Sequence, residues 1–195
     1  MLRDMPSSTH TEPYLKQLDT IIGACGFAVI PVGYGGCSVP ECCGPVAEQP
    51  WMYTVGLSQW GLSEFVLMGL NPGDAQRTLH HLAGAELTGR PQPLDRTLAV
   101  EGTLARLLDV PDEWLLTDPS RMAAWFGYQS RERLTLGLPR VRQVVWADAQ
   151  GRFPDDVGVR PQASLRQPIL RDDPVSQPHR SSRELKRASR HRRAA

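Results

Sequence analysis

The segment WMYTVGLSQWGLSEFVLMGL (residues 51–70) contains two apolar runs separated by a short polar connection. WMYTVGL (51–57) and EFVLMGL (64–70) are rich in aromatic, β-branched and large aliphatic residues, which is typical of strands. The connection SQWGLS (58–63) has the length of a hairpin loop and contains a glycine. The segment therefore predicts two neighbouring strands joined in a hairpin.

On the N-terminal side of this segment, the pattern predicts a helix, a strand and a loop. Leu15, Leu18, Ile21 and Ile22 recur at helical spacing, so we expect an amphipathic helix over residues 12–25. Gly26 is expected to end that helix, and FAVIPV (27–32) has the composition of a strand. Residues 33–50 are dense in Gly, Pro and Cys and are expected to form a loop.

On the C-terminal side, Asn71-Pro72-Gly73 predicts a turn, after which Asp74 is expected to cap a helix that runs to about Leu87. Residues 96–110 fit either a pair of short strands or a helical run, and periodicity does not decide between them.

Further along, Asp118-Pro119 is expected to open a second capped helix. RVRQVVWAD (140–148) reads as the last strand, and residues 148–151 read as a turn.

The elements intermix without a regular βαβ alternation, which favours an α+β fold. We therefore expect a single domain over residues 12–170, with a mixed or antiparallel sheet and helices packed on one side. Residues 1–11 are expected to be flexible. Residues 171–195 lack aromatic residues and have almost no apolar ones, so we expect a disordered tail.

Charge is distributed unevenly along the chain. The formal net charge is +1, but residues 179–195 contain seven Arg or Lys residues and one Glu, which leaves about −5 on the remainder. A strongly basic tail could bind nucleic acid weakly and in a salt-dependent way, or it could be a solubilising extension. Without interleaved aromatic residues, the second interpretation is favoured.

Composition also bears on the compartment. No run approaches the length of about 18 apolar residues that a membrane helix needs, and the first residues have no apolar core of a secretory signal. The four cysteines are then expected to be reduced thiols, and the protein is expected to be cytoplasmic. A chain of 195 residues buries a sufficient core without a cofactor.

Three blocks of sequence together resemble a known family. They are YTVGL (53–57), QVVWAD (143–148) with GRFP (151–154), and QPIL (167–170). In this order and spacing, the chain is similar over about residues 20–170 to the family described as domain of unknown function 4262. The resemblance implies a bacterial, cytoplasmic domain and brings no activity with it.

The sequence departs from the family pattern at two places. Leu62-Ser63 stands where the family has His-Pro before the glutamate that matches Glu64, and Asp155 stands where the family has Trp after Phe-Pro. If these positions belong to a site, this chain carries an altered form of it.

The loop cysteines are the first candidate metal ligands. Cys37, Cys42 and Cys43 could contribute to a zinc site, with Cys25 or one of His80 and His81 as the fourth ligand. A second short-spaced pair is missing, so we predict that no metal or other cofactor is bound. His80 and His81 are adjacent on a predicted helix and are expected at its surface. Asp148, Asp155 and Asp156 surround a turn but lack the spacing of a calcium loop.

Glu64 is a carboxylate at the start of an apolar strand. It could be an exposed first residue, or a buried group paired with Arg142 or Arg152. Polar residues in the three blocks and at Glu64 define a candidate enzymatic site: Tyr53, Thr54, Glu64, Gln143, Trp146, Asp148 and Arg152.

Signatures of common enzyme classes are missing from the sequence. It contains no phosphate-binding Gly-x-x-x-x-Gly-Lys loop and no Gly-x-Ser-x-Gly elbow. We therefore favour a non-enzymatic domain that binds a partner protein or a small molecule. An enzyme of unknown reaction at the residues above is the alternative, and nucleic-acid association through the tail is a weaker one.

Overall fold

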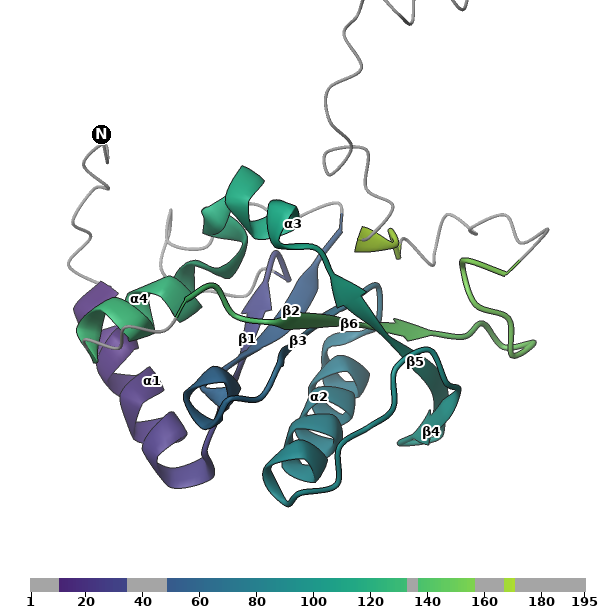
Figure 1. The fold of residues 1–195 in the computed structure, drawn as a ribbon, viewed down its shortest axis with the longest axis horizontal. Helices are drawn as coiled ribbons and strands as arrows, with labels where there is room; N and C mark the ends of the chain where they lie inside the picture. The colour runs from purple at the N-terminus through teal and green to yellow at the C-terminus, as the bar shows by residue number, and fades with distance from the viewer. Residues whose placement is uncertain (1–10, 35–48, 133–136, 157–166, 171–195) are drawn as a thin grey trace, which may run out of the picture.

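The computed structural model describes residues 11–34, 49–132, 137–156 and 167–170 (Figure 1). Helices and strands alternate irregularly along the chain, as expected for an α+β fold. In chain order the elements are α1 (Thr11–Cys25), β1 (Ala28–Val32), β2 (Trp51–Val55), the 3₁₀ turn η1 (Leu57–Trp60), β3 (Glu64–Met68), α2 (Pro72–Leu87), β4 (Leu98–Val100), β5 (Thr103–Val110), α3 (Asp112–Thr117), the 3₁₀ turn η2 (Pro119–Met122), α4 (Ala123–Arg131) and β6 (Val141–Trp146).

The strands form one sheet in the order β1-β2-β3-β6-β5-β4. The predicted hairpin is confirmed, because β2 and β3 pair antiparallel with Tyr53 opposite Val66. The last strand, β6, inserts between β3 and β5 and runs parallel to β3, with Gln143 opposite Val66. The sheet is therefore mixed, and the α+β prediction is confirmed.

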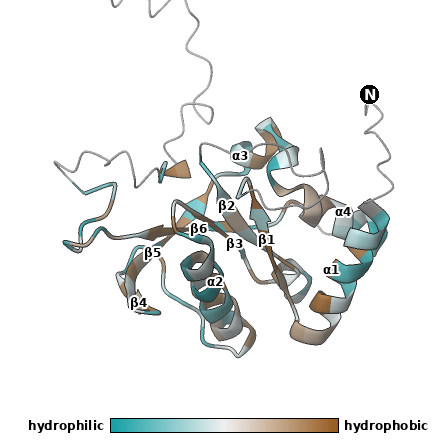
Figure 2. Ribbon diagram, turned by 180° about the vertical axis from the view of Figure 1, so that it is seen from behind, coloured by the Kyte–Doolittle hydropathy of each residue, from teal (hydrophilic) through white to brown (hydrophobic). Residues whose placement is uncertain are grey.

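Helices cover both faces of the sheet, so the expectation of helices on one side is wrong. Side chains of α1, α3 and α4 pack with Tyr53, Val55 and Val66 on one face, whereas α2 packs with Phe65 and Leu67 on the other (Figure 1). Successive side chains of a strand point to opposite faces of the sheet, and in β2 and β3 the side chains on both faces are mainly apolar. Both faces of these strands therefore need to be covered by helices. Figure 2 shows the strands as mainly hydrophobic and α1 and α2 as partly hydrophilic.

The predicted helix starts differ from the structure by a few residues. Asn71, not Asp74, caps α2, and its side-chain oxygen accepts a hydrogen bond from the Asp74 backbone N–H at 3.0 Å. Asp118 does cap the turn that it was expected to open, but that turn is the 3₁₀ segment η2, and α4 starts only at Ala123. The short helix α3 was not predicted, since six residues are too few for a periodic pattern.

Residues 96–110 contain two strands rather than a helix. β4 and β5 form a hairpin whose two turn residues, Glu101 and Gly102, both have positive φ angles (49° and 79°). A turn of this kind matches the right-handed twist of the two strands that it joins.

The flexible N-terminus was predicted for residues 1–11 and the disordered basic tail for residues 171–195; residues 1–10 and 171–195 lie outside the described residues, and Thr11 is the first residue of α1. None of the helices in the described part of the chain is long and apolar enough to span a membrane.

Candidate functional site

Glu64, the first residue of β3, is completely buried. Its Oε1 accepts three hydrogen bonds, from the Gly56 backbone N–H at 3.1 Å and from the Ser58 N–H and hydroxyl at 2.9 Å each. Its Oε2 accepts one from the Thr54 hydroxyl at 2.7 Å. Four donors therefore surround the carboxyl group, and no cation is among them.

The backbone conformation at Gly56 directs these donors at Glu64. Gly56 has a φ of 117°, which side-chain-bearing residues rarely adopt. A Cβ at this position would lie 3.0 Å from the Gly26 carbonyl oxygen and 3.1 Å from the Phe27 Cα. Glycine thus lets the chain turn sharply after β2, so that η1 packs against the start of β3.

Both sequence-based interpretations of Glu64 are wrong in part. The residue is not exposed, and it is not paired with Arg142 or Arg152. Arg142 contacts Glu86 of α2 at 3.1 Å, because it lies on the opposite face of the sheet from Glu64. Burial raises the pKa of the Glu64 carboxyl, and the hydrogen bonds from Ser58, Thr54 and Gly56 oppose that rise.

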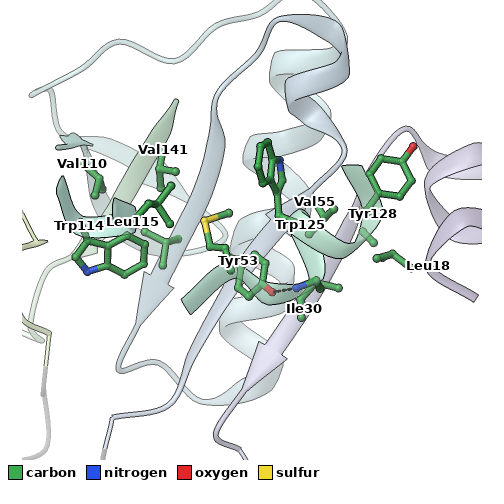
Figure 3. Packing of buried hydrophobic residues seen from close by; sticks show 14 of the residues in the cluster. Leu18, Ile30, Tyr53, Val55, Val110, Trp114, Leu115, Trp125, Tyr128 and Val141 are labelled. Atoms are coloured by element: carbon green, nitrogen blue, oxygen red, sulfur yellow. Dashed lines mark hydrogen bonds between the residues drawn. The ribbon is translucent and has the colours of Figure 1, made fainter. Parts of the chain in front are cut away.

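The hydrogen bonds continue from Glu64 into α4. The Trp125 indole N–H donates to the Ser58 hydroxyl at 2.9 Å, so this hydroxyl is oriented to donate to Glu64. Nearby, the Tyr53 hydroxyl accepts a hydrogen bond from the Ala124 backbone N–H at 3.0 Å (Figure 3). Burial raises the pKa of Tyr53 well above its ordinary value. The network joins α4 to the end of the β2–β3 hairpin.

This network is covered by the core that Figure 3 shows around Tyr53 and Trp125. Thr54 and Glu64 are fully buried, and Tyr53 is 2% exposed. Contact with a substrate requires exposure that these side chains do not have. Catalysis by these residues stays a prediction, and their burial is the reason to look for a binding surface elsewhere.

A second group of polar side chains lies along β6. The Gln143 side chain donates to the Pro168 carbonyl at 2.6 Å and accepts from the Leu170 N–H at 2.8 Å. The Gln167 side chain accepts from the Trp146 N–H at 3.0 Å and donates to the Trp146 carbonyl at 2.9 Å. Two glutamine side chains therefore fasten residues 167–170 to β6 as backbone pairing would.

The turn after β6 is stabilised by Asp148 and Arg152. Asp148 Oδ1 accepts the backbone N–H groups of Gln150 and Arg152 at 2.9 Å each, and Oδ2 receives the Arg152 guanidinium at 2.7 and 3.0 Å. The Arg152 backbone N–H and then its side chain lower the pKa of Asp148. The turn leads into Phe153, whose ring centroid lies 3.8 Å from the Arg106 guanidinium carbon.

The seven residues of the predicted enzymatic site are thus divided between two places. Tyr53, Thr54 and Glu64 belong to the network beneath α4, and the remaining four belong to β6 and the turn that follows it: Gln143, Trp146, Asp148 and Arg152. Each group makes hydrogen bonds to the backbone of neighbouring segments.

An open pocket of about 560 Å³ lies where β2 begins and β3 ends. Its walls come from segments that are far apart in the sequence. They include Gln49, Trp51, Met68, Trp114, Arg121, Pro154, Asp155, Pro168, Ile169 and Leu170. Pockets of this size hold small molecules in other proteins.

Trp51 and Arg121 are the polar features of the pocket that sequence reasoning missed. The Trp51 indole nitrogen is buried and has no hydrogen-bond partner among the described residues. The Arg121 guanidinium carbon lies 5.0 Å from the centroid of the Trp114 ring, and Nη1 donates to the Trp114 carbonyl at 2.9 Å. No local motif marks these residues, because the pocket exists only after residues 51, 114 and 121 come together.

The residues along β6 hold the walls of this pocket. The Trp146 indole N–H donates to the carbonyl of Met68 at 2.9 Å, and Met68 lines the pocket. Gln143 holds Pro168 and Leu170, which form another wall. Gln143 and Trp146, which are not among the lining residues, therefore position parts of the pocket wall.

The model for the family described as Domain of unknown function (DUF4262) matches residues 23–160, more than two thirds of the chain. The chain belongs to this family. No curated protein and no solved structure matches it.

In this DUF4262 domain, two of the blocks that carry the family resemblance build the pocket walls. Pro154 and residues 168–170 line the pocket directly, and Gln143 and Trp146 hold its backbone. Asp155, where the sequence departs from the family pattern, also lies in the wall.

A second hollow lies beside α2 and is lined by Gly73, Gln76, Arg77, His80, His81 and Glu101. His80 and His81 are exposed, as predicted, and His81 Nδ1 lies 3.1 Å from Glu101 Oε1. Both side chains of that pair are more than 40% exposed, so water screens their interaction.

The metal-site predictions stay predictions. Cys37, Cys42 and Cys43 lie outside the described residues, and Cys25 is an exposed free thiol. Within the described ranges, no three His, Cys, Asp or Glu side chains are grouped to hold a metal ion. Asp155 and Asp156 instead contact Arg106 at 3.4 and 3.1 Å.

Proposed function

We propose that this DUF4262 domain binds a small amphipathic molecule in the pocket between Trp51, Trp114 and residues 168–170, without transforming it. The observation that carries the proposal is that Trp51, a residue of the pocket lining, has a buried indole N–H with no partner among the described residues. An unpaired buried donor costs about 1–3 kcal/mol, and a ligand oxygen would remove that cost.

The composition of the walls supports the same conclusion. Most of the lining side chains are apolar, and the guanidinium of Arg121 is held by the Trp114 carbonyl. Apolar walls with a small number of oriented polar groups are typical of small-molecule sites. The hydrogen bonds from Gln143 and Trp146 to the walls reduce the ordering cost of binding.

A fluorescent probe tests the proposal. The dye 8-anilinonaphthalene-1-sulfonate combines aromatic rings with an anionic group and becomes fluorescent when it leaves water. We expect saturable binding of this dye to the full-length protein. The variant Gln49→Trp, which adds bulk at an exposed position of the pocket lining, is expected to abolish binding.

Gln76→Trp is the matched control, because Gln76 is also exposed but lines the second hollow. It should leave dye binding unchanged. Near-ultraviolet circular dichroism should be the same for wild type and both variants, which excludes dye binding to a loosened core. Equal binding to wild type and Gln49→Trp, or no saturable binding to wild type, would contradict the proposal.

A further inference from the structure

The charges of the described lining residues limit which small molecule fits the pocket. Arg121 is the one cationic side chain among them, and Asp155 is the one anionic side chain. The Asp155 carboxylate lies 3.4 Å from the guanidinium of Arg106, which is not among the lining residues, so the protein itself supplies a cation for this negative charge. The charge that can select a ligand is therefore the positive charge of Arg121.

Arg121 keeps donors for a ligand although it has two neighbours in the protein. Its Nη1 donates to the Trp114 carbonyl at 2.9 Å, which uses one of the five N–H donors of a guanidinium. Asp118 Oδ2 lies 3.8 Å from Arg121 Nε, too far for a hydrogen bond, and the Asp118 side chain is 49% exposed, so water screens the pair. Asp118 Oδ1 accepts hydrogen bonds from the N–H and the hydroxyl of Ser120 instead. The guanidinium makes no other hydrogen bond to a described residue.

The position of Arg121 favours an anion that also has an apolar part. The guanidinium carbon lies 5.0 Å from the centroid of the Trp114 ring, and both residues line the pocket. This contact and the bond to the Trp114 carbonyl hold the guanidinium, so little side-chain freedom is lost when an anion binds. The Arg121 side chain is only 20% exposed, so an anion that pairs with it is less screened than at an open surface. A group bound to Arg121 lies beside the wall that Trp114 forms.

Resting on the proposed function, we propose that the ligand is an apolar monocarboxylate, whose carboxylate pairs with Arg121 and whose hydrocarbon part packs against the apolar walls of the pocket. A planar carboxylate matches the fork of a guanidinium, which can donate two parallel hydrogen bonds to it. One negative charge also balances the one cation of the described lining. A phosphate monoester would bring almost two negative charges at neutral pH, with Asp118 beside Arg121 and Asp155 in the same lining, so it is disfavoured.

Calorimetric titration of the full-length protein with three related compounds tests the charge of the ligand. 4-Phenylbutanoate has the carboxylate, 4-phenylbutanamide has an uncharged group of the same shape, and 4-phenylbutylamine has a positive charge. We expect 4-phenylbutanoate to bind about 10-fold more tightly than the amide, since the amide cannot form the charged contact, and the amine to bind no more tightly than the amide. This comparison uses wild type alone, so it does not depend on the folding of any variant.

Two variants then assign the preference for a carboxylate to Arg121. Arg121→Gln should weaken the binding of 4-phenylbutanoate about 10-fold and leave that of 4-phenylbutanamide unchanged, because the amide has no charge to pair. Arg121→Lys keeps the charge and loses the fork, so it should restore part of the affinity for 4-phenylbutanoate. The control Arg77→Gln removes an exposed arginine from the second hollow and should change neither affinity.

The dye separates failure of this assignment from failure of the pocket. If 4-phenylbutanoate and octanoate at millimolar concentration do not displace dye that Gln49→Trp excludes, the carboxylate assignment is overturned and the pocket stands. Equal binding of 4-phenylbutanoate and its amide to wild type, or tighter binding of 2-phenylethyl phosphate than of 4-phenylbutanoate, would also overturn the assignment alone. Failure of the dye to bind saturably would overturn the proposed function, and the assignment with it.

Discussion

The buried carboxyl of Glu64 should make the stability of this domain depend on pH in a specific way. Burial raises the pKa of this group above the value of about 4.3 that it has in an unfolded chain. Between the unfolded and the folded pKa, the folded state therefore binds more protons than the unfolded state. The contribution of Glu64 to stability is complete below pH of about 4.3 and is lost as pH rises through the folded pKa.

Glu64→Gln isolates this contribution. The amide oxygen can accept the three hydrogen bonds at the Oε1 position, and the amide nitrogen can donate to Thr54, so the shape of the network is kept. Glutamine does not titrate. The free energy of unfolding of wild type minus that of Glu64→Gln should therefore fall with pH, at a limiting slope of about 1.4 kcal/mol per pH unit.

The assay is urea unfolding followed by circular dichroism, in steps from pH 4 to pH 8. All other groups titrate equally in the two proteins, so their contributions cancel in the difference. Glu113→Gln is the control, because Glu113 is exposed on α3, and its difference from wild type should stay within about 0.5 kcal/mol at every pH. A flat difference for Glu64→Gln, or one that rises with pH, would refute this account. A rising difference would mean that the four donors outweigh burial.

Removal of the Glu64 side chain tests how much its hydrogen bonds contribute to the free energy of unfolding. Glu64→Ala leaves four donors without an acceptor in a fully buried place, from Thr54, Gly56 and twice from Ser58. At about 1 kcal/mol or more for each donor, the loss should reach about 4 kcal/mol, a large part of the stability of an ordinary domain. A loss below about 1 kcal/mol would show that water or backbone movement satisfies these donors.

Three further substitutions test, in the same urea assay, the hydrogen-bond network around Glu64 and the attachment of residues 167–170 to β6. Gly56→Ala should cost about 3 kcal/mol, because its Cβ would meet the Gly26 carbonyl at a positive φ, whereas Gly61→Ala, also at positive φ but in open space, should cost only about 1 kcal/mol. Trp125→Phe removes the donor to the Ser58 hydroxyl and should cost about 1–2 kcal/mol. Gln143→Ala should cost about 2–3 kcal/mol, speed hydrogen exchange at the Leu170 amide and weaken dye binding, since residues 168–170 lose their attachment to β6. Equal losses for the two glycine variants, or unchanged exchange in Gln143→Ala, would contradict the contacts described.

The strands of the hairpin could be predicted from sequence because their signal is local. An apolar run such as FVLM after Glu64 indicates a strand wherever it occurs, and its apolar character on both sides explains the two covered faces. The prediction of helices on one side of the sheet was nevertheless wrong, because a strand pattern does not show how many faces of the sheet are covered by helices. The short helix α3 could not be predicted, since six residues are too few to show a helical period.

The environment of Glu64 could be anticipated only in part. Its donors lie within ten residues of it, yet their convergence depends on the backbone angles of Gly56, and a sequence does not display those angles. The interpretation as a pair with an arginine failed because Arg142 points to the other face of β6. The pocket could not be predicted from the sequence for a related reason. Trp51, Trp114 and Arg121 meet only through the three-dimensional path of the chain.

The placement of the polar residues along β6 separates the support of the pocket from its lining. Gln143, Gln167 and Trp146 bond to backbone groups: each glutamine amide donates one such hydrogen bond and accepts one, and the Trp146 indole N–H donates one. These residues hold the outline of the pocket, whereas lining residues such as Trp51, Trp114 and Arg121 lie outside QVVWAD and QPIL.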